Sequence, residues 1–142
     1  MTNKRRYTLS KAEKEAVQEK CREALQANPY VNFAFIHGSF LEDEIPFNDI
    51  DIAVHLDEDN LSGNCLDFCL ELSMHISFLV GREVDVHALN NSSLGFCYEA
   101  TKGKLLFAKN EDFCSDYIEK IRLKYFDLKP LLEENLKDLL HG

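Results

Sequence analysis

Two aspartates one residue apart, Asp49 and Asp51, are the side chains of this sequence whose types and spacing best suit chemistry. The run from Asn48 to Leu56 alternates branched apolar residues with polar or small ones, which predicts a strand. Successive side chains of a strand point to opposite faces, so both carboxylates leave one face while the apolar residues enter the core. Two carboxylates roughly 7 Å apart, from a rise of about 3.3 Å per residue, can converge on a small hard cation.

A glycine and a serine upstream of these aspartates offer a place for an anion. Val31 to His37 is apolar and aromatic, which predicts a strand, and Gly38-Ser39 is typical of a tight turn into a short helix. Such a turn exposes backbone N–H groups, and the serine hydroxyl adds a donor. A phosphate cradle followed by two metal-binding aspartates is the layout that metal-assisted phosphoryl or nucleotidyl transfer requires.

A third carboxylate lies on a later segment with the same alternation. Glu83 to Leu89 predicts another strand, and Asp85 can join Asp49 and Asp51 if the two strands are neighbours. Asp85 could complete a metal shell or take the proton from an attacking hydroxyl. His87 lies on the same predicted face, where it could tune the site, touch substrate or be a partly exposed strand histidine.

The combined pattern resembles the nucleotidyltransferase superfamily typified by DNA polymerase beta, and most closely its minimal nucleotidyltransferases, called MNT proteins. The resemblance rests on the Gly-Ser, the short spacer, the Asp-x-Asp and the later strand aspartate, and it covers roughly Val31 to Ala108. It implies an α+β (α/β-like) nucleotidyltransferase fold, in which helices pack on one face of a small mixed sheet. The aspartates are then expected on the uncovered face.

The same resemblance implies a chemistry and assigns roles to the matching residues. Asp49, Asp51 and Asp85 would hold Mg²⁺ (or Mn²⁺), and Gly38 and Ser39 would hold the β- and γ-phosphates of a nucleoside triphosphate, ATP in the favoured reading. A nucleoside monophosphate would pass to a hydroxyl with release of pyrophosphate, and Asp85 would help deprotonate the acceptor. The base preference and the acceptor do not follow from these motifs.

The resemblance also implies a partner. MNT proteins are often antitoxins of an all-helical HEPN toxin, and adenylylation of a tyrosine on that toxin is the associated chemistry. Two alternatives remain open: a catalytically weak module that neutralises its partner by occlusion, and a small-molecule nucleotidyltransferase. One departure bears on this choice, because the acidic loop Glu42-Asp43-Glu44 replaces a basic residue that many family members carry near the triphosphate.

Composition limits the possible partners. The 142 residues predict a single nucleotidyltransferase domain, with residues 1–9 frayed and residues 110–142 forming a C-terminal helical segment. A net charge of −9 argues against a long nucleic acid template. The N-terminus lacks the apolar region of a signal peptide and no segment reaches membrane-spanning length, so a cytoplasmic protein is expected. The five scattered cysteines are expected to be reduced, mostly buried thiols.

The remaining pattern is mostly helical. Ser10-Lys11-Ala12-Glu13 matches a capping box, and Ser62 to Val80 predicts a helix that Gly81 ends. A turn and helix over Asn90–Thr101 and a short strand up to Ala108 follow. Helix is predicted from Asn110 onward, broken or restarted at Pro130. The leucines after that proline could complete the core, bind a partner or join two copies of the chain; they are Leu131, Leu132, Leu136, Leu139 and Leu140.

Overall fold

The computed structural model describes residues 9–41 and 49–141 as four α-helices, one short 3₁₀ helix and four strands. Their order is α1 (Lys11–Gln26), β1 (Val31–His37), η1 (Ser39–Leu41), β2 (Ile50–Leu56), α2 (Cys65–Val80), β3 (Val84–Ala88), α3 (Leu94–Thr101), β4 (Lys104–Ala108) and α4 (Glu111–His141). Residues 1–8 of the N-terminus that was predicted to be frayed, and the acidic loop Glu42-Asp43-Glu44, lie outside the described residues, whereas Leu9 packs against the core.

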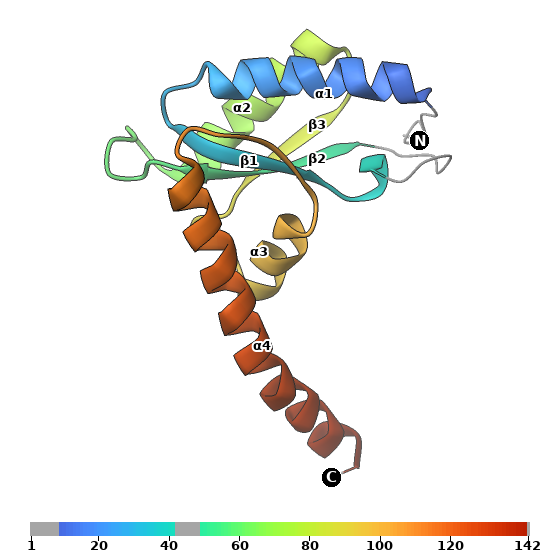
Figure 1. Cartoon of the computed structure of the whole chain (residues 1–142), viewed down its shortest axis with the longest axis vertical. Coiled ribbons are helices and arrows are strands. Elements are labelled where there is room, and N and C mark those ends of the chain that lie inside the picture. The colour runs from blue at the N-terminus through green and yellow to red at the C-terminus, as the bar shows by residue number, and fades with distance from the viewer. Residues whose placement is uncertain (1–8, 42–48, 142) are drawn as a thin grey trace.

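The strands form one mixed sheet in the order β3-β2-β1-β4, which confirms the predicted fold class (Figure 1). β1 pairs antiparallel with both β2 and β4, whereas β2 and β3 are parallel. Parallel neighbours cannot be joined by a tight turn, and α2 supplies the crossover between them. This crossover places the two aspartate-bearing strands side by side.

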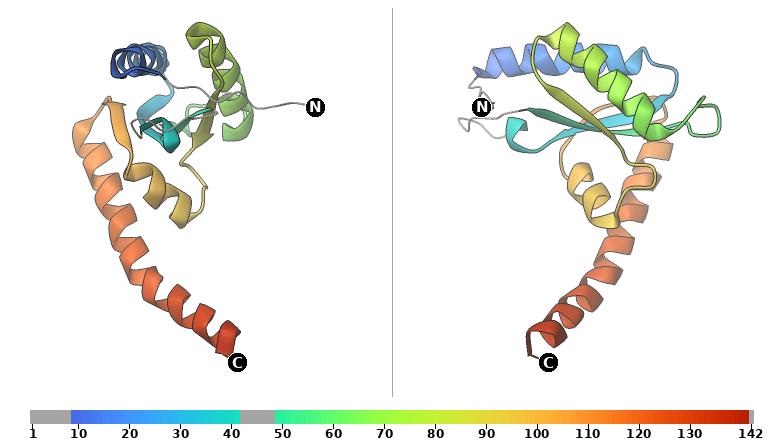
Figure 2. Two further views of the ribbon diagram at one scale, coloured as in Figure 1. Left: turned by 90° about the vertical axis from the view of Figure 1, so that its right-hand side faces the viewer. Right: turned by 180° about the vertical axis from the view of Figure 1, so that it is seen from behind.

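Helices cover both faces of the sheet, which corrects the prediction that they pack on one face only. α1 and α2 bury Cys21, Leu25 and Ile76 against one face, while α3 and α4 bury Cys97 and Cys114 against the other (Figure 2). The reason lies in β1, which is apolar on both sides. Phe33 and Phe35 point away from α1 and α2, so they need a second layer to remove them from water.

Local signals in the sequence account for most helix ends. The capping box at Ser10 is present, since its hydroxyl accepts from the Glu13 N–H and the Glu13 carboxylate accepts from the Ser10 N–H. α2 begins later than predicted because Asn64, rather than Ser62, caps it and accepts from the Asp67 N–H at 2.8 Å. Gly81 ends α2 with a φ of 72°, as predicted.

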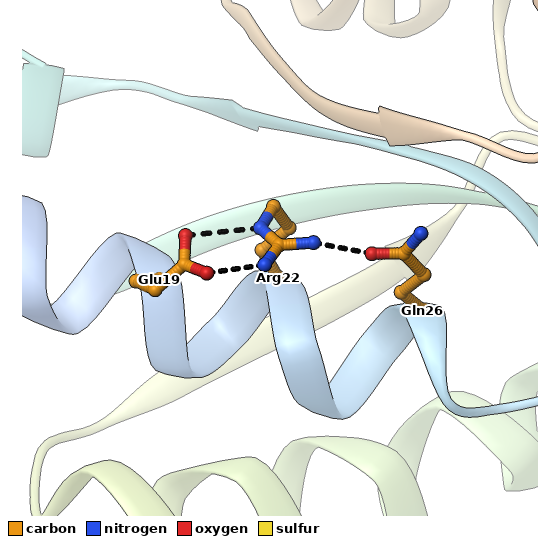
Figure 3. A network of polar contacts seen from close by, with 3 residues as sticks. All are labelled: Glu19, Arg22 and Gln26. Atoms are coloured by element: carbon orange, nitrogen blue, oxygen red, sulfur yellow. Dashed lines mark hydrogen bonds and ion pairs between the residues drawn. The ribbon is translucent and has the colours of Figure 1, made fainter.

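Exposed side-chain pairs run along the outer face of α1. Arg22 Nε donates to a carboxylate oxygen of Glu19 at 2.9 Å, and its guanidinium also contacts Gln26 one turn further on (Figure 3). Residues three and four apart on a helix are neighbours, so this network supports the helix locally without contributing to the core. The face of α1 that carries it is therefore solvated.

Pro130 does not interrupt α4, contrary to the prediction. The helix runs from Glu111 to His141 with the proline inside it, although proline removes one N–H from the ladder. Every residue from Phe126 to Leu140 is exposed, so water can satisfy the carbonyl that loses its donor. The distal half of α4 consequently projects away from the sheet (Figures 1 and 2).

The cysteines and the hydropathy of the helices complete the description of the fold. All five cysteines are free, and Cys65 is the one that is only half-buried. In the part of the chain that the structure describes, no helix combines the length and apolar character of a membrane span.

Candidate functional site

The three predicted aspartates converge at the ends of β2 and β3. The parallel register places Asp51 directly opposite Asp85. Oxygen atoms of these two residues and a ring nitrogen of His87 lie within 4.8 Å of one another. A second group of the same size joins Asp85 to Asp49 and Glu83. Asp85 therefore belongs to both groups and is close to each carboxylate of the Asp-x-Asp motif.

This donor set suits a hard divalent cation. Carboxylate oxygens are the ligands that Mg²⁺ prefers, and the three aspartates are half-buried rather than enclosed, which leaves positions for water and phosphate oxygens. Two like charges at 4 Å repel by about 4 kcal/mol at an effective dielectric constant near 20. Positive charge is the simplest way to offset such repulsion among several carboxylates, so the cluster fits a divalent metal.

The glycine turn after β1 lies against this cluster. Gly38 has a φ of 86°, in the left-handed region that L side chains rarely adopt, and a Cβ at this position would lie 3.0 Å from Asp51 Oδ2. The register agrees, since His37 is the β1 partner of Asp51. Ser39 begins η1, so the predicted short helix is a single 3₁₀ turn. The backbone of the Gly-Ser turn is thereby held beside the carboxylates.

Lys14 supports the same turn, and the sequence reasoning missed it. Its side chain is 6% exposed, Nζ donates to the Phe40 carbonyl at 2.8 Å and lies 5.3 Å from the centre of the Phe40 ring. This contact ties α1 to η1. A signal existed, because Lys14 precedes Cys21 by two helical turns and so falls on the buried stripe of α1, where a cation requires a partner.

Two histidines border the carboxylates. His87 is exposed, whereas burial lowers the pKa of His37, with a smaller contribution in the same direction from His87. Nε2 of His37 is buried and has no hydrogen-bond partner among the described residues. Both rings meet the edge of Phe96, with centroids 5.7 Å away for His37 and 6.1 Å for His87. His37 thus packs on Phe96 while its backbone pairs with that of Asp51.

The comparisons with known proteins agree with this geometry. The model of the family "Polymerase beta, Nucleotidyltransferase" matches residues 19–112, which is more than half of the chain. The chain therefore belongs to the polymerase beta nucleotidyltransferase family. A search of curated proteins finds no match.

Solved structures share the fold over most of the chain. One is a tri-AMPylated Shewanella oneidensis HEPN toxin in complex with MNT antitoxin, with a TM-score of 0.69, 19% identity, and coverage of 89% of this chain and 98% of that one. Another is the toxin–antitoxin MntA-HepT, with a TM-score of 0.68, 19% identity and coverage of 89% and 98%. A third is a toxin–antitoxin with AMP-PNP, with a TM-score of 0.67, 20% identity and coverage of 87% and 98%.

Proposed function

We propose that this chain is a metal-dependent nucleotidyltransferase that transfers AMP from ATP to a hydroxyl of a HEPN-type protein, as the antitoxin of a toxin–antitoxin pair. The observation that carries the proposal is the convergence of Asp49, Asp51 and Asp85 beside the Gly38 turn. The family match supports the reaction class. The three solved relatives, each a toxin–antitoxin by its description, support the biological setting.

Each residue has a proposed role in the transfer. The acceptor oxygen forms a bond to the α-phosphorus of ATP, the bond to the β-phosphate oxygen breaks, and pyrophosphate leaves with that electron pair. Asp85 accepts the hydroxyl proton, which suits a carboxylate that both acidic groups share. The Gly38 and Ser39 turn binds the β- and γ-phosphates. Asp49, Asp51 and Asp85 would hold Mg²⁺, which supplies charge neutralisation at the phosphates.

The distal half of α4 is the proposed anchor for the HEPN-type partner. The leucines after Pro130 are exposed, with Leu136 at 57% and Leu139 at 82%. A domain of this size cannot cover that surface itself, since the helix has already left the sheet (Figure 1). Exposed leucines on one helix are the usual means of docking onto another helical protein.

Co-expression with a HEPN-type protein, taken from the same genome as this chain, tests the proposal. Mass spectrometry of the purified partner is expected to show added AMP when ATP and Mg²⁺ are present, and none with the double variant Asp49→Asn, Asp51→Asn. A partner that is bound but never modified, with excess ATP and Mg²⁺, would instead identify an occlusion module. ATP turnover without any bound partner would indicate a stand-alone enzyme with another acceptor.

A further inference from the structure

A groove runs along the edge of the sheet from the carboxylates to the outer face of α2. It has a volume of about 930 Å³. Glu83, Asp85 and His87 line one side of it, and Leu66, Leu70 and Met74 of α2 line the other. β3 is the edge strand of the sheet, so this groove is open along its length. The wall that contains Asp85 thus continues directly into an apolar surface.

That apolar surface of α2 is exposed to solvent. Leu66 is 69% exposed, Leu70 55% and Met74 75%. They recur every four residues, so they form one row on the helix, and Phe78 extends the row. The opposite face of α2 already supplies Cys69, Leu72 and Ile76 to the core. The exposed row therefore does not contribute to the core of the domain, and an exposed apolar row of this kind is typical of an interaction surface.

The edge strand itself is not available for pairing with a strand of another protein. The Ser73 hydroxyl accepts from the Val86 N–H at 2.8 Å, and the Ser77 hydroxyl accepts from the Val84 N–H at 2.9 Å. The Ser77 hydroxyl also donates to the Val84 carbonyl at 3.2 Å. An added strand would have to break these bonds. The occupant of the groove must instead present side chains, as a helix does.

We infer that this groove seats the acceptor segment of the helical protein that receives AMP, an inference that rests on the proposed function. Transfer requires the acceptor hydroxyl to reach the carboxylate cluster, and the groove is the apolar surface that ends there. Among the described residues that line it, the charged ones, Glu83 and Asp85, are acidic. The segment that fits is thus an amphipathic helix with an apolar row beside α2 and basic residues near its hydroxyl.

This assigns separate tasks to two surfaces. The distal half of α4 retains the partner, and the α2–β3 groove places its hydroxyl for the step in which oxygen bonds to the α-phosphorus and pyrophosphate departs. Docking that only aligns the acceptor changes the transfer rate at a given partner concentration and leaves ATP affinity unaltered. The two surfaces can therefore be separated by measurement.

The test compares Leu70→Glu and Met74→Glu with wild type, using the full chain, Mg²⁺, ATP and the HEPN-type protein. Each change is expected to lower kcat/KM for the partner by about tenfold or more, because a charge would enter an apolar contact. The Kd for ATP, from calorimetry, is expected to stay within a factor of about two. Leu70→Met should retain activity. Leu105→Glu, at the opposite edge of the sheet, adds the same charge outside the groove and should have no effect.

Other outcomes would overturn the inference in distinguishable ways. Transfer at the wild-type rate by both glutamate variants would show that the acceptor lies elsewhere. Loss of ATP binding would show that the nucleotide occupies the groove. A wild-type dimer that becomes monomeric in the variants, with transfer retained, would make the groove an interface between copies. Absence of transfer by the wild-type chain would overturn the proposed function, and with it this inference.

Discussion

The Asp51 carboxylate lies so close to Gly38, at the end of the sheet, that a side chain on the glycine would press against it. A Cβ at Gly38 would lie 3.0 Å from Asp51 Oδ2. The same glycine has a φ of 86°. One position therefore combines a backbone conformation that favours glycine with a close approach to a candidate metal ligand, which joins the proposed phosphate site to the proposed metal site.

Gly38→Ala is expected to weaken Mg²⁺-dependent ATP binding more than it weakens the fold. The positive φ costs about 1–2 kcal/mol of unfolding free energy for an L side chain, and the added methyl also displaces the Asp51 carboxylate. Gly63→Ala is the matched control, since Gly63 has a φ of 90° but nothing within 4 Å of its Cβ position. Similar destabilisation of both variants, with loss of ATP affinity in Gly38→Ala alone, is the predicted calorimetric result. Equal ATP affinity in the two variants would contradict it.

Replacing the carboxylates should separate binding from transfer. Asp49→Asn with Asp51→Asn is expected to lower metal-dependent ATP affinity by about a hundredfold or more, because direct metal ligands are lost. In EDTA, its unfolding free energy should not fall, since neutral amides relieve repulsion within the cluster. Asp85→Asn should reduce the rate of AMP transfer more than it reduces ATP affinity. Retention of ATP affinity in the double variant would disprove the assignment.

Acid should destabilise the fold through His55. This ring stacks on Phe33 at 4.9 Å and meets the edge of Tyr117, and burial lowers its pKa. Below the ordinary histidine pKa near 6.5, the unfolded chain binds a proton at His55 more readily than the folded chain does. The contribution of His55 to the unfolding free energy is therefore fully present above pH ~6.5 and falls as the pH drops below it.

The check is the pH dependence of the unfolding free energy. Each proton taken up only by the unfolded chain contributes a slope of about 1.4 kcal/mol per pH unit. His55→Phe keeps a ring against Phe33 and should lower the slope of the curve below pH ~6.5. An unaltered slope in His55→Phe would mean that other groups control acid unfolding.

Leu136→Glu and Leu139→Glu should prevent complex formation with the HEPN-type partner without altering ATP binding. Both leucines are exposed in the isolated chain, so the substitutions remove no core packing. Each is expected to raise the Kd of the complex by about tenfold or more, as loss of a buried apolar anchor does. Co-purification and analytical ultracentrifugation measure this directly. Glu134→Gln, also exposed on the same stretch, serves as the neutral comparison.

The convergence of the three aspartates could be predicted because it depends on the two-residue alternation of strands, a pattern that is visible in a sequence. The two-residue alternation around Asp51 and Asp85 predicted which face each carboxylate leaves. Whether their strands are neighbours was left as a condition, and the parallel pairing of β2 with β3 meets it. Lys14 was not found, because a lysine on a helix is usually solvated and its partner, the Phe40 carbonyl, is distant in sequence. Every residue has a backbone carbonyl, so a side chain that binds one leaves no complementary residue type in the sequence from which the contact could be predicted.

The row of apolar residues on the outside of α2 was missed for a related reason. α2 carries apolar residues on more than one side, since Cys69 and Ile76 are buried while Leu70 and Met74 are exposed, so the helical period alone does not tell the two faces apart. Only the position of α2 at the sheet edge decides which side is covered. The prediction at Pro130 was wrong because it used a local rule alone. Proline removes one backbone hydrogen bond, and solvent exposure allows the helix to continue without it.

The projecting half of α4 also bears on how long the free chain would survive in a cell. The ring contacts of Tyr125 and Phe126 with Tyr98 are the last aromatic contacts between α4 and α3, and everything from Phe126 to Leu140 is exposed. A helix of about fourteen residues without tertiary packing, such as the stretch after Phe126, is marginal in water and opens readily to proteases. A bound partner would shield these leucines from cleavage. The chain would then be degraded more slowly when more partner is present. Degradation of the unbound chain would limit its amount to what the partner can bind.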